Sequence, residues 1–390
     1  MVACLHLLSK KRGGYVTKKP KLILFSIFLS FFAGLAQGET NKVGLLLPLS
    51  GKFAELGDDC KAGIDIALKN AGNLGIKSVI PEFVYADSVA ESRVAVSEFR
   101  KLVEVEKVSS VLAVRASVGM PVNPLSKSSK IPLVGVVGHR DFASHNPFAY
   151  QYWSNSTEEG EALGLSIGRS GFTNGVLITT EDEWLVDVSS AFRSRFSTLN
   201  GKLSLDEKIL GDELDFRAII SKIKRAMTEG ENTIQFVIAN IALQQQGVFI
   251  KQLREAKISL PVYVNFFFGR PEQIKIAGIE NSEGVKFIEM SSSDPLFVSN
   301  LKAINSQARP NAMSLACLAG TEHIIQAYKI ISTENGVTLK EAFDRIHKTK
   351  IGSLEIPVLE RRAKFRLSLM EVQKGIPREV DIVVDPTTIN

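Results

Sequence analysis

Hydrophobic runs of strand length alternate along the chain with segments whose apolar residues recur at helical spacing. The run KVGLLLPL (42–49), for example, leads through a short loop into a helical pattern near 58–71. Strands that alternate with amphipathic helices are typical of βαβ units, which build parallel sheets. The predicted strands of this first series are 42–49, 81–87, 110–116 and 131–138, with helices near 58–71 and over 95–106.

The alternation starts again after Ser154. The predicted helices of this second series are 158–171, 186–199, 216–227 and 245–256, with strands at 174–180 and 234–240 and further apolar segments at 260–269 and 283–290. Two such series in one chain predict an α/β protein with two doubly wound lobes.

The last third of the sequence does not simply extend the second series. It predicts a long helix over 312–331, another helix over 339–348, and a strand pair within 365–384 whose turn holds Lys374 and Gly375. No low-complexity linker separates these segments, so we expect the chain to cross between the lobes several times. The expected boundaries are 41–154 plus 290–360 for lobe 1, and 155–289 plus 361–390 for lobe 2.

Residues 1–38 have the pattern of a secretory signal peptide. Basic KKPK precedes the apolar run LILFSIFLSFFAGLA (22–36), and small residues follow at Gly34, Ala36 and Gly38. The run is shorter than the roughly 20 residues that span a bilayer, so we expect cleavage, a periplasmic location and no stable membrane insertion afterwards. An uncleaved N-terminal anchor is the alternative. No Cys stands at the expected cleavage site, which argues against a lipoprotein.

The length of the basic leader suggests that its first residues are a translated ribosome-binding region. The segment KKRGGYV can be encoded by a purine-rich ribosome-binding region just before a GTG codon. We therefore hypothesise that Val16 is the true initiator. The codons before Val16 test this, because the hypothesis requires a purine run there.

Net charge excludes one class of partner for the body of the protein. The formal net charge is +5, but six of the 47 basic residues lie in 1–38, where there is no Asp or Glu. The remainder holds 41 basic and 42 acidic residues. Without a basic excess, nucleic acid is not an expected partner.

Two cysteines remain beyond the leader, Cys60 and Cys317. Export allows disulfides, but both lie in apolar helical patterns, where free Cys commonly behaves as a small core hydrophobe. We expect two buried thiols, with a disulfide as the alternative.

The sequence lacks the motifs of common enzymes and cofactor sites. HExxH, P-loop and CxxC patterns are all missing, and His139 and His145 have no nearby Cys or acidic pair to complete a metal site. We therefore expect no enzymatic activity, no metal and no cofactor.

Small and hydroxyl residues follow several strands of the first series. They are Ser50-Gly51, Ser117 and Gly138-His139. Each alone is what a turn or helix N-cap requires, but ligands of open α/β sheets bind at the carboxyl ends of strands. Three such positions on successive strands of one lobe favour a binding site.

The sequence also resembles type I periplasmic solute-binding proteins of the branched-chain amino acid and amide class, over nearly all of its length after the leader. The matching stretches are GLLLPLSGKFAELGDDCKAGIDIAL, YADSVAESRVAVSEFRKLVEVEKVSSVLA, SKIPLVGVVG, TEEGEALG, LDFRAIISKIK and KGIPREV. The resemblance implies two lobes, joined by three crossovers, that close over a small molecule.

The resemblance also implies ligand-binding residues. Ser117 matches a hydroxyl that commonly binds the ligand carboxylate, and the backbone N–H groups of Gly138 and His139 match others that do so. Trp184 stands where relatives often have a Tyr that contacts the ligand. The remaining matches are Leu56, at a position often held by an aromatic residue, and Asn240 and Phe268 on second-lobe strand ends.

The sequence departs from the family pattern at or next to three of these positions. His139 replaces the usual Ser or Thr, Leu56 replaces an aromatic residue, and AVRAS lacks the usual Gly-Pro before Ser117. The implied function is capture of a small polar solute, such as an amino acid, amide or carboxylate, for delivery to an ABC permease. The alternative is an interaction or sensory module of the same fold, such as a penicillin-binding-protein activator, which needs no ligand.

Overall fold

The computed structural model describes residues 41–73, 79–228, 233–291, 294–304 and 310–387. Residues 39–390 form one compact unit. The predicted signal peptide, Cys4 and Val16 lie outside the described residues. Within the described ranges, no helix combines the length and apolar character needed to cross a membrane.

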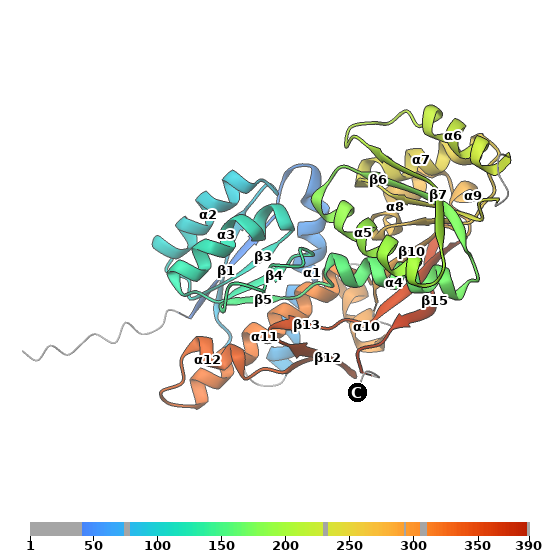
Figure 1. Ribbon diagram of the computed structural model, residues 1–390. Helices are drawn as coiled ribbons and strands as arrows, with labels where there is room; N and C mark the ends of the chain where they lie inside the picture. The colour runs from blue at the N-terminus through green and yellow to red at the C-terminus, as the bar shows by residue number, and fades with distance from the viewer. Residues whose placement is uncertain (1–40, 74–78, 229–232, 292–293, 305–309, 388–390) are drawn as a thin grey trace, which may run out of the picture. The chain divides into compact units, whose positions relative to one another are not determined.

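The strands form two separate sheets (Figure 1). The first has the order β11-β12-β13-β5-β4-β3-β1-β2. Pairing is parallel from β2 through β13 and antiparallel among β13, β12 and β11. Its strands are β1 (Lys42–Leu47), β2 (Glu82–Asp87), β3 (Ser110–Val114), β4 (Leu133–Val136), β5 (Ala149–Gln151), β11 (Lys348–Ile351), β12 (Leu354–Leu359) and β13 (Arg362–Ala363).

The second sheet has the order β15-β14-β10-β9-β8-β6-β7. Pairing is parallel from β7 through β10 and antiparallel among β10, β14 and β15. Its strands are β6 (Asn174–Thr180), β7 (Lys202–Ile209), β8 (Phe236–Asn240), β9 (Val262–Val264), β10 (Lys286–Met290), β14 (Leu367–Gln373) and β15 (Ile376–Val384). Two α/β lobes, as the sequence predicts, are therefore confirmed.

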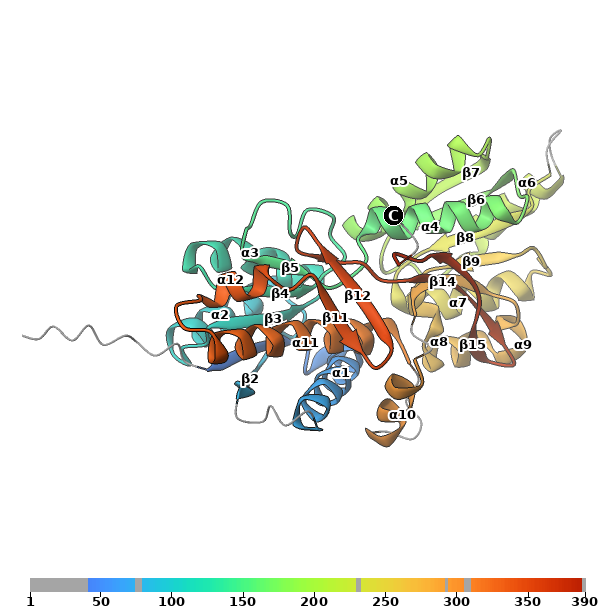
Figure 2. The same ribbon diagram turned by 90° about the horizontal axis from the view of Figure 1, so that it is seen from below.

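Helices cover both faces of each sheet. In the first lobe α1 and α11 lie on one face and α2 and α3 on the other (Figures 1 and 2). The helices are α1 (Ala54–Asn73), α2 (Ser92–Glu104), α3 (Ala116–Ser129), α4 (Ser156–Arg169), α5 (Glu183–Thr198), α6 (Arg217–Thr228), α7 (Leu243–Glu255), α8 (Pro271–Ala277), α9 (Ile279–Ser282), α10 (Pro295–Ile304), α11 (Ala312–Thr333) and α12 (Leu339–Asp344), with short 3-10 turns η1 (Gly51–Phe53) and η3 (Phe266–Gly269).

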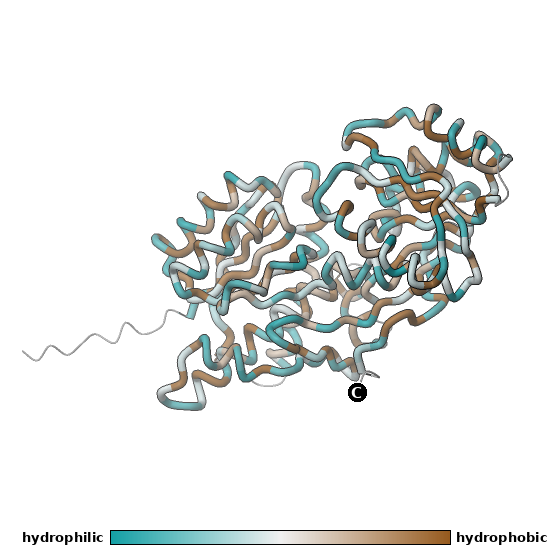
Figure 3. Tube along the Cα trace, viewed as in Figure 1, coloured by the Kyte–Doolittle hydropathy of each residue, from teal (hydrophilic) through white to brown (hydrophobic). Residues whose placement is uncertain are grey.

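The central strands are apolar on both faces because helices cover both faces. In β1, Val43, Leu45 and Leu47 belong to the core beneath α1 and α11, whereas Leu46 belongs to the core beneath α2. The hydropathy tube accordingly shows brown runs along the strands of both sheets (Figure 3). This is the pattern expected for buried parallel strands, which read as continuous hydrophobic runs.

The chain passes between the two sheets three times, after β5, after β10 and after β13. The last pass is short, because β13 ends at Ala363 and β14 begins at Leu367. β14 then pairs with β15 in a hairpin whose turn holds Lys374 and Gly375, as predicted. Both turn residues have positive φ, the conformation that two-residue hairpin turns favour.

Helices α1 and α11 pack at unusually close range. A Cβ at Gly63 would lie 2.2 Å from the carbonyl oxygen of Ser314, so only Gly permits this approach. One turn earlier, Cys60 forms a disulfide with Cys317, with 5.2 Å between their Cα atoms. The expectation of two free thiols is therefore wrong, although both cysteines are fully buried. Tertiary packing brings together two positions that are 257 residues apart.

The sequence analysis missed several elements for identifiable reasons. Helix α3 contains Pro121 and Pro124, which argue against a helix in a sequence pattern. Strand β7 is an edge strand with charged side chains, and its burial alternates without any fully apolar run. The helix predicted over 339–348 ends at Asp344, because the chain continues into β11 and β12, a hairpin that no strong periodicity marks.

Candidate functional site

The carboxyl ends of strands from both sheets meet at one place. Arg115 follows β3, and Gly138 and His139 follow β4. From the second sheet, Trp184 comes shortly after β6, and Phe266 and Phe267 follow β9. We call these six residues, together with Phe53, Trp153 and Arg270, the interlobe site.

Trp184 and Gly138 are in direct contact across this site. Asp182 caps α5 by accepting hydrogen bonds from the backbone N–H groups of Trp184 (3.1 Å) and Leu185 (3.3 Å), which fixes the start of the helix. A Cβ at position 138 would lie 2.9 Å from Trp184 Nε1 and 3.3 Å from Trp153 Cδ1. Gly at 138 therefore leaves the space that the indole of Trp184 occupies.

Four aromatic rings form a continuous apolar surface at the site. The ring centroids of Trp184 lie 5.6 Å from Phe266 and 5.8 Å from Phe267, and those two phenylalanines lie 4.5 Å apart. Trp153 lies 5.2 Å from Phe266. These separations are typical of interacting aromatic pairs. The rings are tilted against one another by 48° to 71°, and together they offer an apolar wall.

Charged pairs join the lobes around the aromatic wall. His139 Nε2 lies 3.1 Å from Glu183 Oε1, and His139 Nδ1 accepts a hydrogen bond from the backbone N–H of Asp141. In neutral His139 the proton is therefore on Nε2, from where it is donated to Glu183. Arg140 lies 3.7 Å from Asp187. These pairs connect the end of β4 with α5.

Arg270 makes the firmest bridge between the lobes. It follows η3 in the second lobe and donates to Glu55 (2.9 Å) and Asp59 (2.7 Å) on α1. Its side chain is only 15% exposed. Burial raises the pKa of Asp59, and the charge and hydrogen bond of Arg270 oppose that shift. A partly buried Arg with two carboxylate partners is a stronger contact than an exposed ion pair.

Arg115 has a strained backbone conformation directly after the carboxyl end of β3. Its φ is +81°, and its guanidinium Cζ lies 3.6 Å from the ring centroid of Phe53. Its Nε is buried and has no hydrogen-bond partner among the described residues. Burial lowers the pKa of Arg115 to about 10, while the charge of Asp182 acts in the opposite direction. Stacking on an aromatic ring leaves the in-plane N–H groups of a guanidinium free to donate.

The structure brings together only some of the residues that the sequence analysis proposed. Gly138, His139 and Trp184 belong to the interlobe site. Ser117 lies in the first turn of α3, and its hydroxyl donates to the carbonyl oxygen of Ala90 at 2.8 Å, in the loop before α2. Its single donor therefore holds two segments of the first lobe together.

Leu56, Asn240 and Phe268 lie in the packed interior, and their side chains do not belong to the interlobe site. Leu56 and Phe268 are 2% and 0% exposed and sit in hydrophobic cores. The amide of Asn240 donates to the carbonyl oxygen of Leu185 and to Ser189 Oγ on α5. Asn240 therefore positions the helix that carries Trp184.

The sequence analysis missed six residues of the interlobe site, namely Phe53, Arg115, Trp153, Phe266, Phe267 and Arg270. A signal for three of these positions was present. Arg115 is the one charged residue in the predicted strand 110–116, and NFFFG (265–269) places three aromatic residues together at the end of the apolar segment 260–269. Nothing in the local sequence of Arg270 predicts its partners on α1, which precede it by more than 200 positions.

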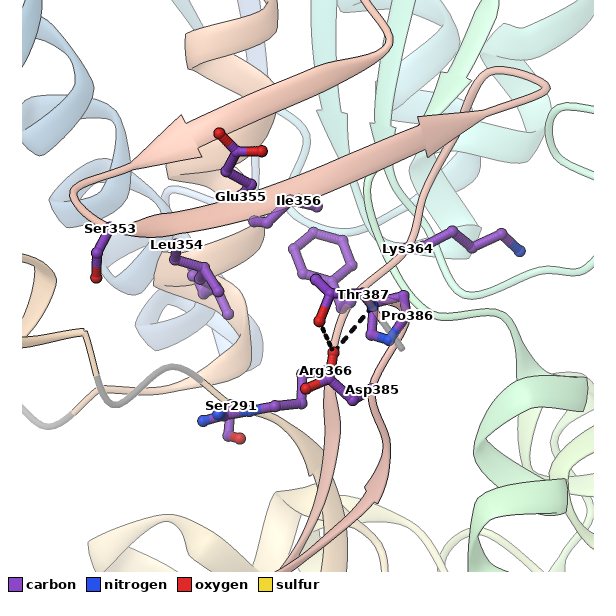
Figure 4. Close-up of a pocket in the computed structure, with 12 residues that line it drawn as sticks. Ser291, Ser353, Leu354, Glu355, Ile356, Lys364, Arg366, Asp385, Pro386 and Thr387 are labelled. Atoms are coloured by element: carbon purple, nitrogen blue, oxygen red, sulfur yellow. Dashed lines mark hydrogen bonds between the residues drawn. The ribbon is translucent and has the colours of Figure 1, made fainter. Parts of the chain in front are cut away.

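A cavity of about 350 Å³ lies elsewhere, at the crossover segments (Figure 4). Its walls come from β12, from the chain between β13 and β14, and from the segment after β15. Charged side chains there have partners: Lys364 with Glu158, and Arg366 with Glu379. These pairs hold the crossovers together. Among the described residues no cluster of three or more His, Cys, Asp or Glu could hold a metal ion.

Comparison with known proteins identifies the family. The model of the periplasmic binding protein family matches residues 40–363. A curated relative, Leu/Ile/Val-binding protein homolog 6 of Brucella abortus, is 28% identical over 228 residues. That alignment spans 55% of this chain and 55% of the relative.

Solved structures of the same architecture are similar to this chain at low sequence identity. One is the branched-chain amino acid transporter substrate-binding protein LivJ of Streptococcus pneumoniae in complex with isoleucine (TM-score 0.76, 16% identity, 87% of this chain and 98% of that one). Another is an ABC transporter solute-binding protein of R. palustris in complex with benzoate (TM-score 0.76, 18% identity, 88% and 96%). These similarities concern the fold.

The family model covers most of the chain, and the two-lobed architecture agrees with it. The chain therefore belongs to the periplasmic binding protein family.

Proposed function

We propose that the protein is an extracytoplasmic solute-binding protein that captures a small solute bearing a carboxylate or similar polar group and delivers it to an ABC permease. The observation that carries this proposal is the interlobe site. There the carboxyl ends of β3, β4, β6 and β9 bring polar donors and an aromatic wall together between two lobes. Ligands of open α/β sheets bind at such strand ends.

Family membership supports the same function. The curated relative is named a Leu/Ile/Val-binding protein homolog, and the similar structures hold isoleucine and benzoate. All are substrate-binding proteins rather than enzymes, so we propose a binding role without catalysis or cofactor. The proposed location is the periplasm, after removal of residues 1–38 as a signal peptide.

We propose the lobe boundaries stated for the sequence, with the ligand between them. The proposed first-lobe contacts are Gly138 and His139, and the proposed second-lobe contact is Trp184. We do not propose Ser117, Leu56, Asn240 and Phe268 as ligand contacts. The side chains of Ser117 and Asn240 form hydrogen bonds within their own lobes, and Leu56 and Phe268 are buried in hydrophobic cores.

One observation favours a second function, a ligand-independent interaction module. The indole of Trp184 already occupies the space in front of Gly138, and three ion pairs and the His139–Glu183 hydrogen bond join the lobes around it. A module whose lobes stay together without a ligand needs such a filled junction.

A thermal-shift screen against amino acids, amides, aromatic and aliphatic carboxylates and purines tests the two functions. A carrier will be stabilised by at least one solute, because a ligand that binds only the folded state raises the unfolding temperature. The carrier also requires that Trp184→Ala weaken that binding. If no solute stabilises the protein, the interaction module replaces the carrier.

A further inference from the structure

Two hydrogen-bond donors at the interlobe site have no acceptor. Both Arg115 Nε and Trp184 Nε1 are buried without a partner among the described residues. Buried donors are normally paired, because an unpaired one has given up its hydrogen bonds to water. One donor comes from each lobe, so the site is short of an acceptor at the place where the lobes meet.

The acidic side chains around the site are already engaged. Glu183 faces His139, and Asp187 faces Arg140. The charge of Asp182 acts to raise the pKa of Arg115, and its Oδ1 caps α5. No carboxylate that the structure describes lies within hydrogen-bond distance of the Arg115 guanidinium.

The acids on α1 are engaged in the same way. Glu55 and Asp59 both accept from Arg270. A ligand ammonium would therefore have to break an existing pair to find a carboxylate. An anion, in contrast, would meet the Arg115 guanidinium, which has no carboxylate partner in the part of the chain that the structure describes. Burial strengthens the attraction between these two opposite charges.

The geometry of Arg115 suits an anion at its edge. The Phe53 ring covers one face of the guanidinium, with its centroid 3.6 Å from Arg115 Cζ, and this contact fixes the position of the group. The N–H groups lie in the plane, so the edge stays available for the paired oxygens of a carboxylate. The positive φ of Arg115 is a strained conformation, and such strain clusters at ligand-binding positions.

The remainder of the site suits an aromatic or other apolar body, which tilted rings can contact by face or by edge. Trp153, Trp184, Phe266 and Phe267 present aromatic rings with no charge among them. A ligand would take the place that the Trp184 indole now fills before Gly138, and the shifted indole would still carry an unused N–H.

We propose that the interlobe site selects an organic anion, with a carboxylate on an aromatic or other apolar body and no ammonium group, and that Arg115 is its anion anchor together with the indole N–H of Trp184. This inference rests on the proposed solute-binding function and narrows it. It predicts that charge and the absence of an ammonium group decide which solutes bind.

Isothermal titration calorimetry with four probes tests the inference: benzoate, its neutral analogue benzamide, L-phenylalanine and L-leucine. We expect benzoate to bind about 100-fold tighter than benzamide, because a charge-assisted contact to a guanidinium is lost with the amide. Both amino acids should bind at least about tenfold more weakly than benzoate, because their ammonium groups find no free carboxylate.

Variants assign the effect to the two donors. Arg115→Met should weaken benzoate binding about 100-fold, and Arg115→Lys, which keeps the charge, should lose about tenfold. Trp184→Phe keeps an aromatic ring without the N–H and should lose about fivefold to tenfold. Arg100→Met on the exposed face of α2 is the matched control and should bind as the parent does. Circular dichroism confirms that each variant is folded.

Three results would overturn the inference. If L-leucine or L-phenylalanine binds tighter than benzoate, and Arg115→Met leaves that binding unchanged, the proposed function stands but the anion anchor is wrong. Equal binding of benzamide and benzoate would also reject the anchor. If none of these probes and no solute of the wider screen binds the folded protein, the solute-binding function fails together with the inference.

Discussion

Trp184 Nε1 lies 2.9 Å from the position that a Cβ would take at Gly138. The two residues come from different lobes, so a side chain at 138 would push the lobes or the indole apart. We expect Gly138→Ala to expose Trp184, shifting its emission to longer wavelength and increasing the radius of gyration in small-angle scattering. Gly211→Ala is the control, because its Cβ would meet nothing closer than 3.8 Å. An unchanged spectrum in Gly138→Ala would show that the indole is not confined there.

Arg270 provides a second test of lobe contact. Arg270→Met should favour separated lobes, since it removes the hydrogen bonds to Glu55 and Asp59 and leaves Asp59 partly buried without its cation. Charge-assisted contacts of this kind contribute about 1.5–3 kcal/mol each, so ligand affinity should fall at least about tenfold. Arg217→Met is the matched control, because Arg217 pairs only with the nearby, exposed Asp215. If both variants bind equally well, the Arg270 bridge does not contribute to closure.

The disulfide between Cys60 and Cys317 predicts a definite thiol count. The 390-residue chain has three cysteines, so the denatured, unreduced protein should give one free thiol, that of Cys4, and none once residues 1–38 are removed. Reduction should lower the free energy of unfolding by about 2–5 kcal/mol, because the crosslink restricts the unfolded chain over a long loop. Urea denaturation with and without reductant measures this. Three free thiols before reduction would contradict the bond.

Much of the fold can be predicted from the sequence because parallel strands buried on both faces carry unbroken apolar runs. The run from Val43 to Leu47 is an example, since its two faces meet different helices. Elements that depend on tertiary context could not be predicted in this way. Helix α3 tolerates Pro121 and Pro124, and β7 is held at the sheet edge by pairing with β6 rather than by its own hydrophobicity.

The site was harder to predict than the fold. Gly138 and His139 could be predicted because the end of an apolar run in the sequence marks the end of a strand, where ligands of such sheets bind. Whether a strand-end side chain faces the cleft or the protein interior depends on packing that a single strand does not reveal. Ser117 donates to Ala90 and Asn240 holds α5, while Arg115, two positions before Ser117, reaches the site.

Glu159 predicts a pH dependence of stability. It is buried and accepts hydrogen bonds from Trp153 Nε1 and Ser154 Oγ, both at 2.9 Å, and burial raises its pKa from 4.5 to about 8. Because the folded state holds this proton more tightly than the unfolded state, stability is fully present below about pH 4.5 and is lost as the pH rises through about 8. The slope reaches at most about 1.4 kcal/mol per pH unit for one proton.

Glu159→Gln should remove this contribution. Its unfolding free energy should depend less on pH between 5 and 8 than that of the parent, as measured by urea denaturation at several pH values. Half-buried Glu289 and Glu322, whose pKa values desolvation raises to about 7, titrate in both proteins, so the difference between parent and variant isolates Glu159. The exposed Glu161 on the same helix is the control, and Glu161→Gln should leave the profile unchanged. Parallel profiles for parent and Glu159→Gln would contradict the buried proton.

The strained backbone of Arg115 predicts that Gly at this position gives a more stable protein than Ala, the reverse of the order usual within helices. Both Arg115→Ala and Arg115→Gly lose the guanidinium and its contact with Phe53, so both should lose the anchor for an anion. Only Gly adopts the φ of +81° without strain, so Arg115→Gly should be about 1 kcal/mol more stable than Arg115→Ala. At Arg100, inside α2, the order should be the opposite, since Gly is about 1 kcal/mol worse than Ala within a helix. Urea denaturation of the four variants measures both differences. If Ala is the more stable residue at both positions, Arg115 is not held in the positive-φ conformation, and its guanidinium is free to leave the site.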